Sequence, residues 1–517
     1  MVKPQKPLLL LSLVFVLLAL LTFVLPKETS FGSKVVNGDT TARFTLDYFS
    51  FNDVFFPTPK DTVPDISEVQ NLVAQLDLLE AMEDEEEEKE PLIDNNADPL
   101  KVDTIKPKKV DISHLLEAKY RIQFPDSSYD ALAKFFTALS KSSDSSELIR
   151  IIHYGDSQLE GDRITSDLRK KFQKRFGGCG LGLAPIIESV DARSTIKQEY
   201  PEGWKKYLIY GTGYENEYKH NYGLLGSYFG YDVVGDSSYL DSTIAEDAVG
   251  HLDSLWIKFT KPYSYMRKYV HFDNIKLLYG DVPEKTSLKV SDKDTSLNYE
   301  IPASTGFGVL KIPYKGDPSF EEMTLEFKAH KSPQLYGVCF DCNGGVAVDN
   351  VGMRGSSGIE FLRIDKDFFS REMIKMNVRL LILQYGVNVV PGEMESYKWY
   401  ENKMYTRIRR LKALNPNMNI LVVGVSDMSK KVEEDMVSYP NVKLIRDAQR
   451  NAAKRSGVAF WDLYEAMGGE NSMVAWVEAE EPLAGADYTH FNSKGARMVA
   501  SMLYNAIMLE YEQYTKN

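Results

Sequence analysis

The sequence is poor in cysteine and has fewer basic than acidic residues. Three cysteines in 517 residues do not make a disulfide-rich scaffold. Cys339 and Cys342 form an isolated Cys-x-x-Cys, without the second pair or the nearby histidines that a zinc site needs. We expect structural thiols or a local disulfide there. The formal net charge of −13 argues against a general phosphate-binding surface, so no nucleic-acid partner is expected.

Motifs of several enzyme classes are also missing. The chain contains no G-x-x-x-x-G-K-[ST] phosphate loop, no H-E-x-x-H zinc helix and no G-x-S-x-G elbow. The glycines between Gly177 and Gly182 follow a predicted helix and do not stand between a strand and a helix, so they do not support a dinucleotide loop. We therefore expect neither a metal nor an organic cofactor.

Long apolar runs are scarce, but one is present near the N-terminus, from Leu8 to Leu25. As a helix it would span about 27 Å, close to the ~30 Å hydrocarbon core of a bilayer. Lys3 and Lys6 precede it, which keeps the N-terminus in the cytoplasm under the positive-inside rule. Residues 1–26 are thus predicted to be an inner-membrane anchor, with the catalytic region in the periplasm or outside the cell. A cleaved signal peptide is the alternative, although no A-x-A pattern follows.

The rest of the chain divides by composition. Residues 27–115 are predicted to be an acidic flexible tether, because prolines, an acidic run and low hydrophobicity favour an extended chain, with a short helix near 69–82. Residues 116–186 and 347–517 alternate strands with helices, which indicates an α/β fold with a parallel sheet. Residues 187–346 are rich in Tyr, Thr, Val and Ser with recurrent turn residues, and predict an inserted all-β sandwich.

The periodicity places the individual elements. The α/β strands are predicted at 147–153, 380–384, 420–425 and 458–461. The α/β helices are predicted at 129–139, 163–175, 393–414, 442–453 and 493–509. The strands of the insertion are predicted at 255–259, 268–272, 275–278, 287–290, 308–312 and 323–328.

Ser157 is the candidate nucleophile. It lies in Gly-Asp-Ser-Gln, residues 155–158, after a buried strand and before a helix. Sites in parallel α/β sheets are built at the carboxyl ends of strands, and a helix N-terminus favours developing negative charge. The alternative is that Ser157, or Asp156 before it, only caps the helix.

A serine nucleophile needs a base, and the base needs a carboxylate to orient it. Two Asp-x-x-His pairs are present, Asp111/His114 and Asp487/His490. Asp487 and His490 lie in a predicted loop before the last helix, where this spacing can turn both side chains toward one point. Asp111 and His114 precede the first core strand and are interpreted as surface residues. His153 is interpreted as a buried strand residue.

An oxyanion hole requires donors aimed at the charge that develops on the tetrahedral intermediate. Asn388 follows the strand 380–384, and its side-chain amide is a suitable donor. Gly355 offers a backbone N–H with no side chain in the way, and Gly352 or Gly358 are alternatives. Each of these residues alone is also an ordinary turn residue.

In chain order, Gly-Asp-Ser, a glycine, Gly-x-Asn and a C-terminal Asp-x-x-His resemble the SGNH/GDSL hydrolase superfamily. The resemblance covers roughly residues 145–185 and 345–515 and implies a flavodoxin-like parallel sheet. It also implies that Ser157 is the nucleophile, His490 the base and Asp487 its orienting carboxylate. Gly355 and Asn388 would then form the oxyanion hole together with the Ser157 N–H.

Two departures accompany the resemblance. Gln158 replaces the leucine of the common GDSL spelling, and a large β insertion separates Ser157 from Gly355. The insertion is similar in placement to carbohydrate-binding-like insertions in bacterial peptidoglycan O-acetylesterases. The resemblance therefore implies an acylated carbohydrate as substrate.

The expected function is a serine esterase that hydrolyses ester groups, O-acetyl groups above all, on cell-envelope or other carbohydrates. The first alternative is an O-acyltransferase that uses the same triad with a membrane acyltransferase partner. The second is a non-catalytic envelope glycan-binding protein, which the presence of all five site residues argues against.

Overall fold

The computed structural model describes residues 28–31, 44–47, 63–75, 78, 117–126, 130–142, 147–188, 193–209, 221–231, 254–261, 271–314, 321–329 and 331–516. The chain forms two units that meet at residues 62 and 63. In the first, strands β1 (Glu28–Phe31) and β2 (Phe44–Asp47) pair antiparallel. No helix within the described ranges has the length and hydropathy to cross a membrane, and the anchor predicted at 8–25 lies outside those ranges.

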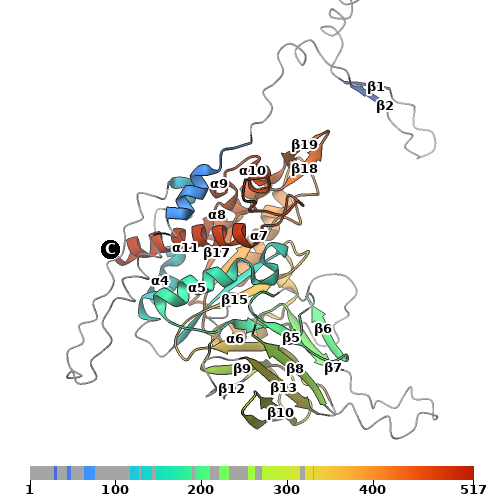
Figure 1. Cartoon of the computed structure of the whole chain (residues 1–517), viewed down its shortest axis with the longest axis vertical. Coiled ribbons are helices and arrows are strands. Elements are labelled where there is room, and N and C mark those ends of the chain that lie inside the picture. Colours follow the sequence, from blue (N-terminus) through green and yellow to red (C-terminus); the bar gives the residue numbers. More distant parts are fainter. Residues whose placement is uncertain are drawn as a thin grey trace, which may run out of the picture. The chain divides into compact units, whose positions relative to one another are not determined.

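A five-stranded parallel sheet is the centre of the second unit (Figure 1). Its strands are β3 (Leu148–Gly155), β15 (Gly345–Gly352), β16 (Val378–Gln384), β17 (Asn419–Val423) and β20 (Ala459–Trp461). They are ordered β15-β3-β16-β17-β20. Counted along this domain the order is 2-1-3-4-5, that of flavodoxin-like sheets. The topological switch point therefore lies between the carboxyl ends of β3 and β16, where such sheets place their ligands.

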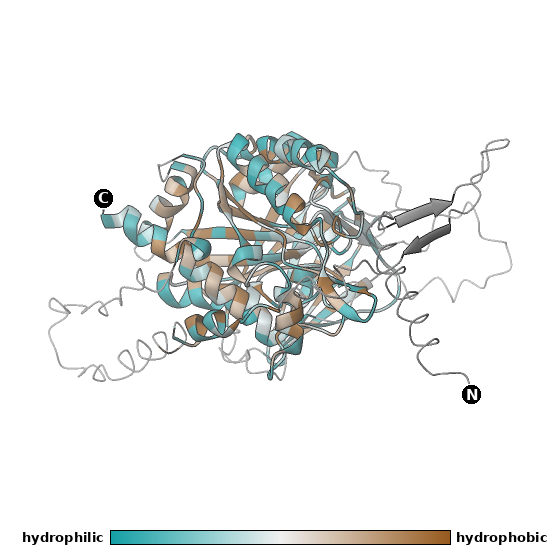
Figure 2. Ribbon diagram, turned by 90° about the horizontal axis from the view of Figure 1, so that it is seen from above, coloured by the Kyte–Doolittle hydropathy of each residue, from teal (hydrophilic) through white to brown (hydrophobic). Residues whose placement is uncertain are grey.

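Helices cover both faces of this sheet because its strands are apolar on both sides. Leu380 and Ile382 of β16 belong to one hydrophobic cluster, and the alternate residues Leu381 and Leu383 belong to the other. The first cluster includes α4 (Asp130–Ser142), α5 (Thr165–Phe176) and α11 (Ser493–Lys516). The second includes α6 (Lys366–Lys375), α7 (Lys398–Lys412) and α8 (Val442–Ser456). Figure 2 shows hydrophobic residues along the strands and hydrophilic ones on the helices around them.

The insertion consists of two antiparallel sheets, ordered β11-β10-β13-β8-β5 and β12-β9-β14-β7-β6. Their strands are β5 (Lys197–Glu199), β6 (Trp204–Leu208), β7 (Ser227–Tyr231), β8 (Ser254–Thr260), β9 (Asn274–Tyr279), β10 (Thr286–Ser291), β11 (Ser296–Ile301), β12 (Gly308–Pro313), β13 (Glu322–Lys328) and β14 (Leu335–Asp341). The sheets face each other across an apolar core, in which the rings of Phe259 and Phe340 lie 5.1 Å apart. Most of the predicted strand 268–272 lies outside the described ranges.

The chain passes between the two domains at a segment that a disulfide cross-links, here called the neck. A short strand, β4 (Gly182–Ala184), precedes the predicted start of the insertion at residue 187 but pairs with β14 of the insertion. Cys179 and Cys342, 163 residues apart, form a disulfide beside it. Cys339 is buried and reduced, so the local Cys339–Cys342 disulfide that the spacing allowed does not form. Cross-linking so long a loop restricts the unfolded chain and stabilises the neck.

A buried charge cluster joins the parallel sheet to the insertion. Arg150 of β3 donates to both carboxylate oxygens of Asp349 in β15, at 2.6 and 2.7 Å, and to Asp341 of β14 at 2.5 Å. Lys276 of β9 donates to Asp341 at 2.9 Å, and the N–H of Leu183 donates to Asp349 at 2.9 Å. Arg150, Asp341 and Asp349 are almost fully buried. The insertion is therefore attached to the sheet by paired charges as well as by apolar contact.

Part of the predicted tether belongs to the second unit and packs in its core. Residues 67–75 are helical, and Val69 and Leu72 are buried in the same cluster as α11. Glu68 accepts a hydrogen bond from Tyr120 Oη at 3.0 Å and pairs with Lys119 at 2.6 Å. The tether is thus not extended throughout, and residues 79–116 lie outside the described ranges.

Candidate active site

Ser157 lies at the switch point of the parallel sheet. β3 ends at Gly155, and Ser157 is the first residue of the short helix η2 (Ser157–Asp162). The capping role belongs to Asp156, whose carboxylate accepts the Gln158 N–H at 3.1 Å. The Ser157 side chain is not used as a cap, and the residue is 8% exposed. Its hydroxyl is directed instead to a histidine.

Ser157, His490 and Asp487 form one chain of hydrogen bonds. Ser157 Oγ lies 2.8 Å from His490 Nε2, and His490 Nδ1 lies 2.7 Å from Asp487 Oδ2. Burial acts to raise the pKa of Asp487, but hydrogen bonds from His490 and from the Thr489 N–H outweigh it and the pKa is lowered. An ionised Asp487 accepts a hydrogen bond from the Nδ1–H of His490, which leaves Nε2 to accept a hydrogen bond from the Ser157 hydroxyl. The arrangement can therefore activate a serine hydroxyl.

The loop that carries His490 is fixed at both ends. The His490 carbonyl accepts the Gly485 N–H at 2.8 Å, and Ala484 pairs with Phe491 in an isolated bridge. Asn492 then caps α11, accepting the N–H groups of Lys494 and Gly495 at 2.9 and 3.0 Å. The imidazole is thus presented from a rigid turn, as a preorganised base requires.

Gln158 links this turn to the nucleophile segment, a role that the sequence did not reveal. Its Nε2 donates to the Thr489 carbonyl at 2.6 Å, and its Oε1 accepts the Phe491 N–H at 3.3 Å. These are the backbone groups on either side of His490. The one sign of this role in the sequence was a polar residue at the position where the common GDSL motif has leucine.

Replacing Gln158 with leucine is expected to lower kcat by roughly 10- to 100-fold with little change in KM, because a misplaced base affects the transition state more than binding. Steady-state kinetics on an aryl acetate would measure this. Gln173→Leu is the matched control, since Gln173 bonds only the Gly180 carbonyl at the neck. Equal kcat in the two variants would show that Gln158 does not position His490.

The predicted oxyanion donors lie on two neighbouring loops. The Gly386 N–H donates to Asp156 at 3.1 Å, which ties the end of β16 to that of β3. Asn388, two residues on, donates from Nδ2 to the Ser356 carbonyl at 3.0 Å, so its described hydrogen bond reaches the Gly355 loop and not Ser157. Gly355 has φ +81° and is exposed. Gly358, one of the alternatives, has its N–H engaged by Ser356 Oγ. A second N–H of the Asn388 amide is not used by this bond.

Asp156 holds the two strand ends together and has a shifted pKa. Burial raises its pKa to about 6, against the hydrogen bonds from the N–H groups of Gln158, Gly386 and Val387. Because the pKa of Asp156 in the folded state lies above the ordinary aspartate value of 3.8, the folded state binds more protons between these pH values. The contribution of Asp156 to stability is therefore present below about pH 4 and is lost as the pH rises toward 6.

Replacing Asp156 with asparagine is expected to reduce the dependence of the free energy of unfolding on pH. A shift of about two pKa units corresponds to about 3 kcal/mol, so the wild type should lose up to that amount between pH 4 and 6 through this group. Urea unfolding at several pH values, wild type against Asp156→Asn, measures the difference. Burial also raises the pKa of Asp427 to about 6. Both proteins contain Asp427, so its contribution cancels in the difference between them. The prediction would be contradicted if the free energy of unfolding changed with pH by the same amount in both proteins.

The other candidate groups do not form a second site. His153 is buried between Gln384 Oε1 at 3.0 Å and Thr165 Oγ1 at 3.2 Å, and burial lowers its pKa to about 4, so it is a neutral core residue. The pair at 111 and 114 lies outside the described ranges. One group in the described part of the chain has metal-ligand chemistry: Cys179, His271, Asp273 and Cys342, within 4.8 Å of one another. Both of its sulfurs are bonded in the disulfide and cannot act as thiolate ligands.

A parallel sheet of flavodoxin-like order with a hydrogen-bonded Ser, His and Asp at its switch point is the arrangement of a serine hydrolase. The GDSL-like lipase/acylhydrolase family matches residues 325–498, which include Gly355, Asn388, Asp487 and His490 but not Ser157. The match supports the resemblance to SGNH/GDSL hydrolases and an esterase activity.

The fold is similar to that of one solved structure, described as a peptidoglycan O-acetylesterase in action. It is 19% identical with a TM-score of 0.58, and the match covers 76% of this chain and 99% of that one. A weaker match, to the acetyl xylan esterase AlAXEase, is 18% identical over 31% of this chain and 81% of that one, with a TM-score of 0.25. No curated protein matches the chain. At this identity the likeness establishes the fold.

Proposed function

We propose that the protein removes O-acetyl groups from carbohydrates through Ser157, His490 and Asp487. The observation that carries the proposal is the continuous pair of hydrogen bonds, 2.8 Å from Ser157 to His490 and 2.7 Å from His490 to Asp487. These three residues come from segments more than 300 positions apart, and their convergence at the switch point has no evident structural purpose.

In the acylation half, Ser157 Oγ attacks the acetyl carbonyl carbon while His490 Nε2 takes the hydroxyl proton. Negative charge develops on the carbonyl oxygen, and we assign its stabilisation to the N–H groups of Ser157 and Gly355 and to the Asn388 amide. The C–O bond to the sugar then breaks, and His490 returns the proton to the departing sugar oxygen. Asp487 keeps the imidazole oriented and stabilises its cation.

In the deacylation half, water gives its proton to His490 and its oxygen attacks the acetyl-serine carbonyl. The ester bond to Ser157 breaks, the proton returns to Oγ, and acetate leaves. A sugar hydroxyl in place of water would make the same site an O-acyltransferase, with a membrane acyltransferase partner as acetyl source. The residues are the same for both reactions, so the acceptor decides between them.

Two features support a carbohydrate substrate in a cell envelope. The solved structure with the similar fold is described as a peptidoglycan O-acetylesterase, and its match covers 76% of this chain and 99% of that one. The apolar run from Leu8 to Leu25 supports a membrane anchor that places the catalytic region outside the cytoplasm. Under this proposal the substrate is an O-acetylated polysaccharide near the membrane surface.

The proposal is tested with the full chain and a fluorophosphonate probe, followed by mapping of the labelled peptide. Label at Ser157 and release of acetate from 4-nitrophenyl acetate are expected. Incubation with O-acetylated glycans, tracking free acetate against newly acetylated acceptor, separates hydrolysis from transfer. Absence of both label and acetate release from folded protein would leave a glycan-binding protein as the better account.

A further inference from the structure

The short helix that begins at Ser157 is interrupted by a kink at residues 160–162. The backbone leaves helical geometry at Glu160, with φ −54° and ψ 141°, and at Gly161, with φ 72°. Asp162 follows in the left-handed region at φ 64°, which is strained for a residue with a side chain. Such strain persists only where surrounding contacts hold it, and it is common at functional sites. The residues around the kink are therefore candidates for a role in the reaction.

Asp162 holds the kink from its buried side. Its carboxylate accepts two hydrogen bonds from Arg169, at 2.8 and 3.1 Å, and one from Thr195 Oγ1 at 2.8 Å. Arg169 also donates to the Val348 carbonyl of β15 at 2.7 Å. Because Asp162 is fully buried, relaxation of the kink into a regular helix would break bonds to a buried charge. The kink is thus a fixed part of the fold.

Arg163 joins the kink to the base turn, residues 485–491, which carries His490. Its Nε donates to the Glu160 carbonyl at 3.0 Å, and its Nη1 donates to the Phe491 carbonyl at 3.1 Å. Phe491 directly follows His490. Both bonds come from one planar guanidinium, so the two carbonyls are held at a fixed separation. Arg163 therefore sets the distance between the nucleophile segment and the base turn.

Gln158 and Arg163 hold the same residue of the base turn from two directions. Gln158 Oε1 accepts the Phe491 N–H at 3.3 Å, and Arg163 donates to the Phe491 carbonyl. The ring of Phe491 is buried, with its centroid 5.2 Å from that of Trp476. Both polar backbone groups and the side chain of Phe491 are thus fixed, directly beside His490.

The charge of Arg163 also acts on the triad. Burial lowers the pKa of Arg163, the charges of Glu160 and Asp487 raise it, and the charge of Arg354 lowers it further. Asp487 is the carboxylate that bonds His490 Nδ1. The attraction between the guanidinium and Asp487 therefore adds to the carbonyl bonds in drawing the base turn toward the nucleophile segment.

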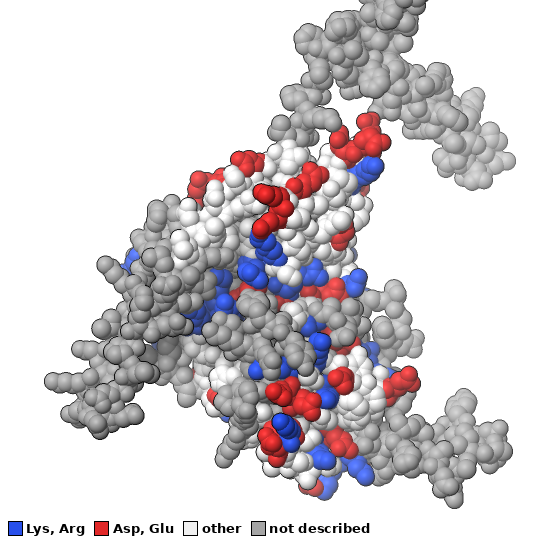
Figure 3. All heavy atoms as spheres, viewed as in Figure 1, with Lys and Arg blue, Asp and Glu red and all other residues white. Residues whose placement is uncertain are grey.

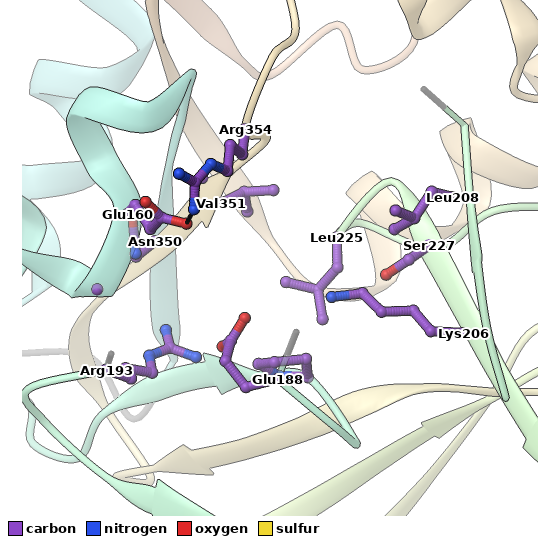
Figure 4. Close-up of a pocket in the computed structure, with 13 residues that line it drawn as sticks. Glu160, Glu188, Arg193, Lys206, Leu208, Leu225, Ser227, Asn350, Val351 and Arg354 are labelled. Carbon is purple, nitrogen blue, oxygen red and sulfur yellow. Dashed lines mark hydrogen bonds and ion pairs between the residues drawn. The ribbon is translucent and has the colours of Figure 1, made fainter. Parts of the chain in front are cut away.

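A second link leaves the kink, but it is weaker. The Glu160 carboxylate pairs with Arg354 at 3.1 Å, as Figure 4 shows, and Arg354 directly precedes Gly355. The Arg354 side chain is 66% exposed. Acidic and basic side chains are interspersed over the face drawn in Figure 3, and exposed pairs of this kind contribute little. The partly buried Arg163, with two charge-assisted hydrogen bonds, is the stronger link.

We propose that Arg163 is a positioning residue that fixes the base turn against the nucleophile segment, and so holds His490 within hydrogen-bond distance of Ser157. The proposal rests on the proposed esterase function of Ser157. Proton transfer from Ser157 Oγ to His490 Nε2 depends steeply on their separation, which is 2.8 Å. Loss of Arg163 should therefore slow acylation and leave substrate binding almost unchanged.

The test is steady-state hydrolysis of 4-nitrophenyl acetate by the full chain. Arg163→Met is expected to lower kcat by roughly 10- to 100-fold and to change KM by less than about twofold. Arg163→Lys keeps the charge but lacks the planar fork that holds two carbonyls, so it should lose only about three- to tenfold. Methylguanidinium added to Arg163→Ala should restore kcat severalfold, which a general loss of stability would not allow.

Arg410→Met is the matched control, because Arg410 is also partly buried and donates to a backbone carbonyl, that of Ile364 at 2.6 Å. It should keep the kcat of the wild type. The inference is overturned if Arg163→Met has the kcat of Arg410→Met, or if its KM rises while kcat is unchanged. If Arg163→Met does not fold, a lack of any rescue of folded Arg163→Ala by methylguanidinium overturns it. A wild type that releases no acetate overturns the esterase proposal itself, a result distinct from an active wild type with unaffected variants.

Discussion

Replacing Ser157 with alanine is expected to lower kcat by roughly three to six orders of magnitude on any ester, while leaving the fold intact. The reason is that the hydroxyl is the atom that forms the acetyl-enzyme bond, and no neighbouring group can replace it. His490 would remain beside Asp487 but would have no proton to accept. Residual activity would come from binding and the oxyanion donors acting on water.

Acetate release and fluorophosphonate labelling measure this together. Ser157 is only 8% exposed and its side chain makes one hydrogen bond, to His490, so loss of the hydroxyl should cost little stability. Ser140→Ala is a suitable control, because Ser140 is exposed on α4 and bonds the Thr137 carbonyl. A Ser157→Ala variant with the activity of Ser140→Ala would refute the triad.

Much of the fold could be predicted because its elements follow simple periodicities. The predicted strands at 380–384 and 420–425 correspond to β16 and β17, and the predicted helices at 442–453 and 493–509 correspond to α8 and α11. In the insertion, the strands predicted at 275–278 and 287–290 fall within β9 and β10. Apolar alternation and turn residues determine these elements locally, so no knowledge of distant contacts was needed.

The strand β15 was not predicted, and its residues explain why. Its sequence Gly-Val-Ala-Val-Asp-Asn-Val-Gly places Asp349 and Asn350 where a buried parallel strand is normally apolar. Asp349 is buried because Arg150, almost 200 residues earlier, pairs with it. The disulfide partner of Cys342 was hidden for the same reason, since Cys179 lies 163 residues earlier in the sequence. Pairings that depend on long-range topology leave no local periodicity.

The residues of the site can also be divided into those that the sequence predicted and those whose roles it did not show. Ser157, Asp487 and His490 were predicted as the triad because their types and order carry chemical meaning, and the structure brings them within hydrogen-bond distance of one another. Gln158 was not assigned a role, and for Asp156 only the helix cap was considered, because a glutamine or aspartate beside a nucleophile has no distinctive spacing. Their functions lie in hydrogen bonds to backbone groups of other loops, Thr489 and Gly386 among them. Such partners are backbone atoms, which are alike in nearly all residues, so a sequence pattern does not identify them.

Replacing Arg150 with methionine is expected to destabilise the protein by about 3–5 kcal/mol, the usual cost of breaking a buried ion pair by removing one partner. Burial opposes the charge of Arg150, but Asp341 and Asp349 outweigh it and its pKa is raised. Without Arg150, Asp349 keeps the Leu183 N–H but loses its cation, and Asp341 keeps only Lys276. Two buried carboxylates would then share one ammonium at the junction of two domains.

Lys285→Met is the control, since Lys285 pairs with Glu300 at 2.8 Å while both side chains are exposed, 65% and 67%, and exposed pairs contribute about 0–1 kcal/mol. Urea unfolding followed by tryptophan fluorescence reports both domains, because Trp204 and Trp256 lie in the insertion and Trp461 and Trp476 in the hydrolase domain. The tryptophans of both domains should report the loss of stability in Arg150→Met, because Arg150 bonds Asp349 of the sheet and Asp341 of the insertion. If Arg150→Met unfolds at the same urea concentration as Lys285→Met, the charge cluster does not couple the domains. In that case the Cys179–Cys342 disulfide and apolar packing alone would hold the insertion on the parallel sheet.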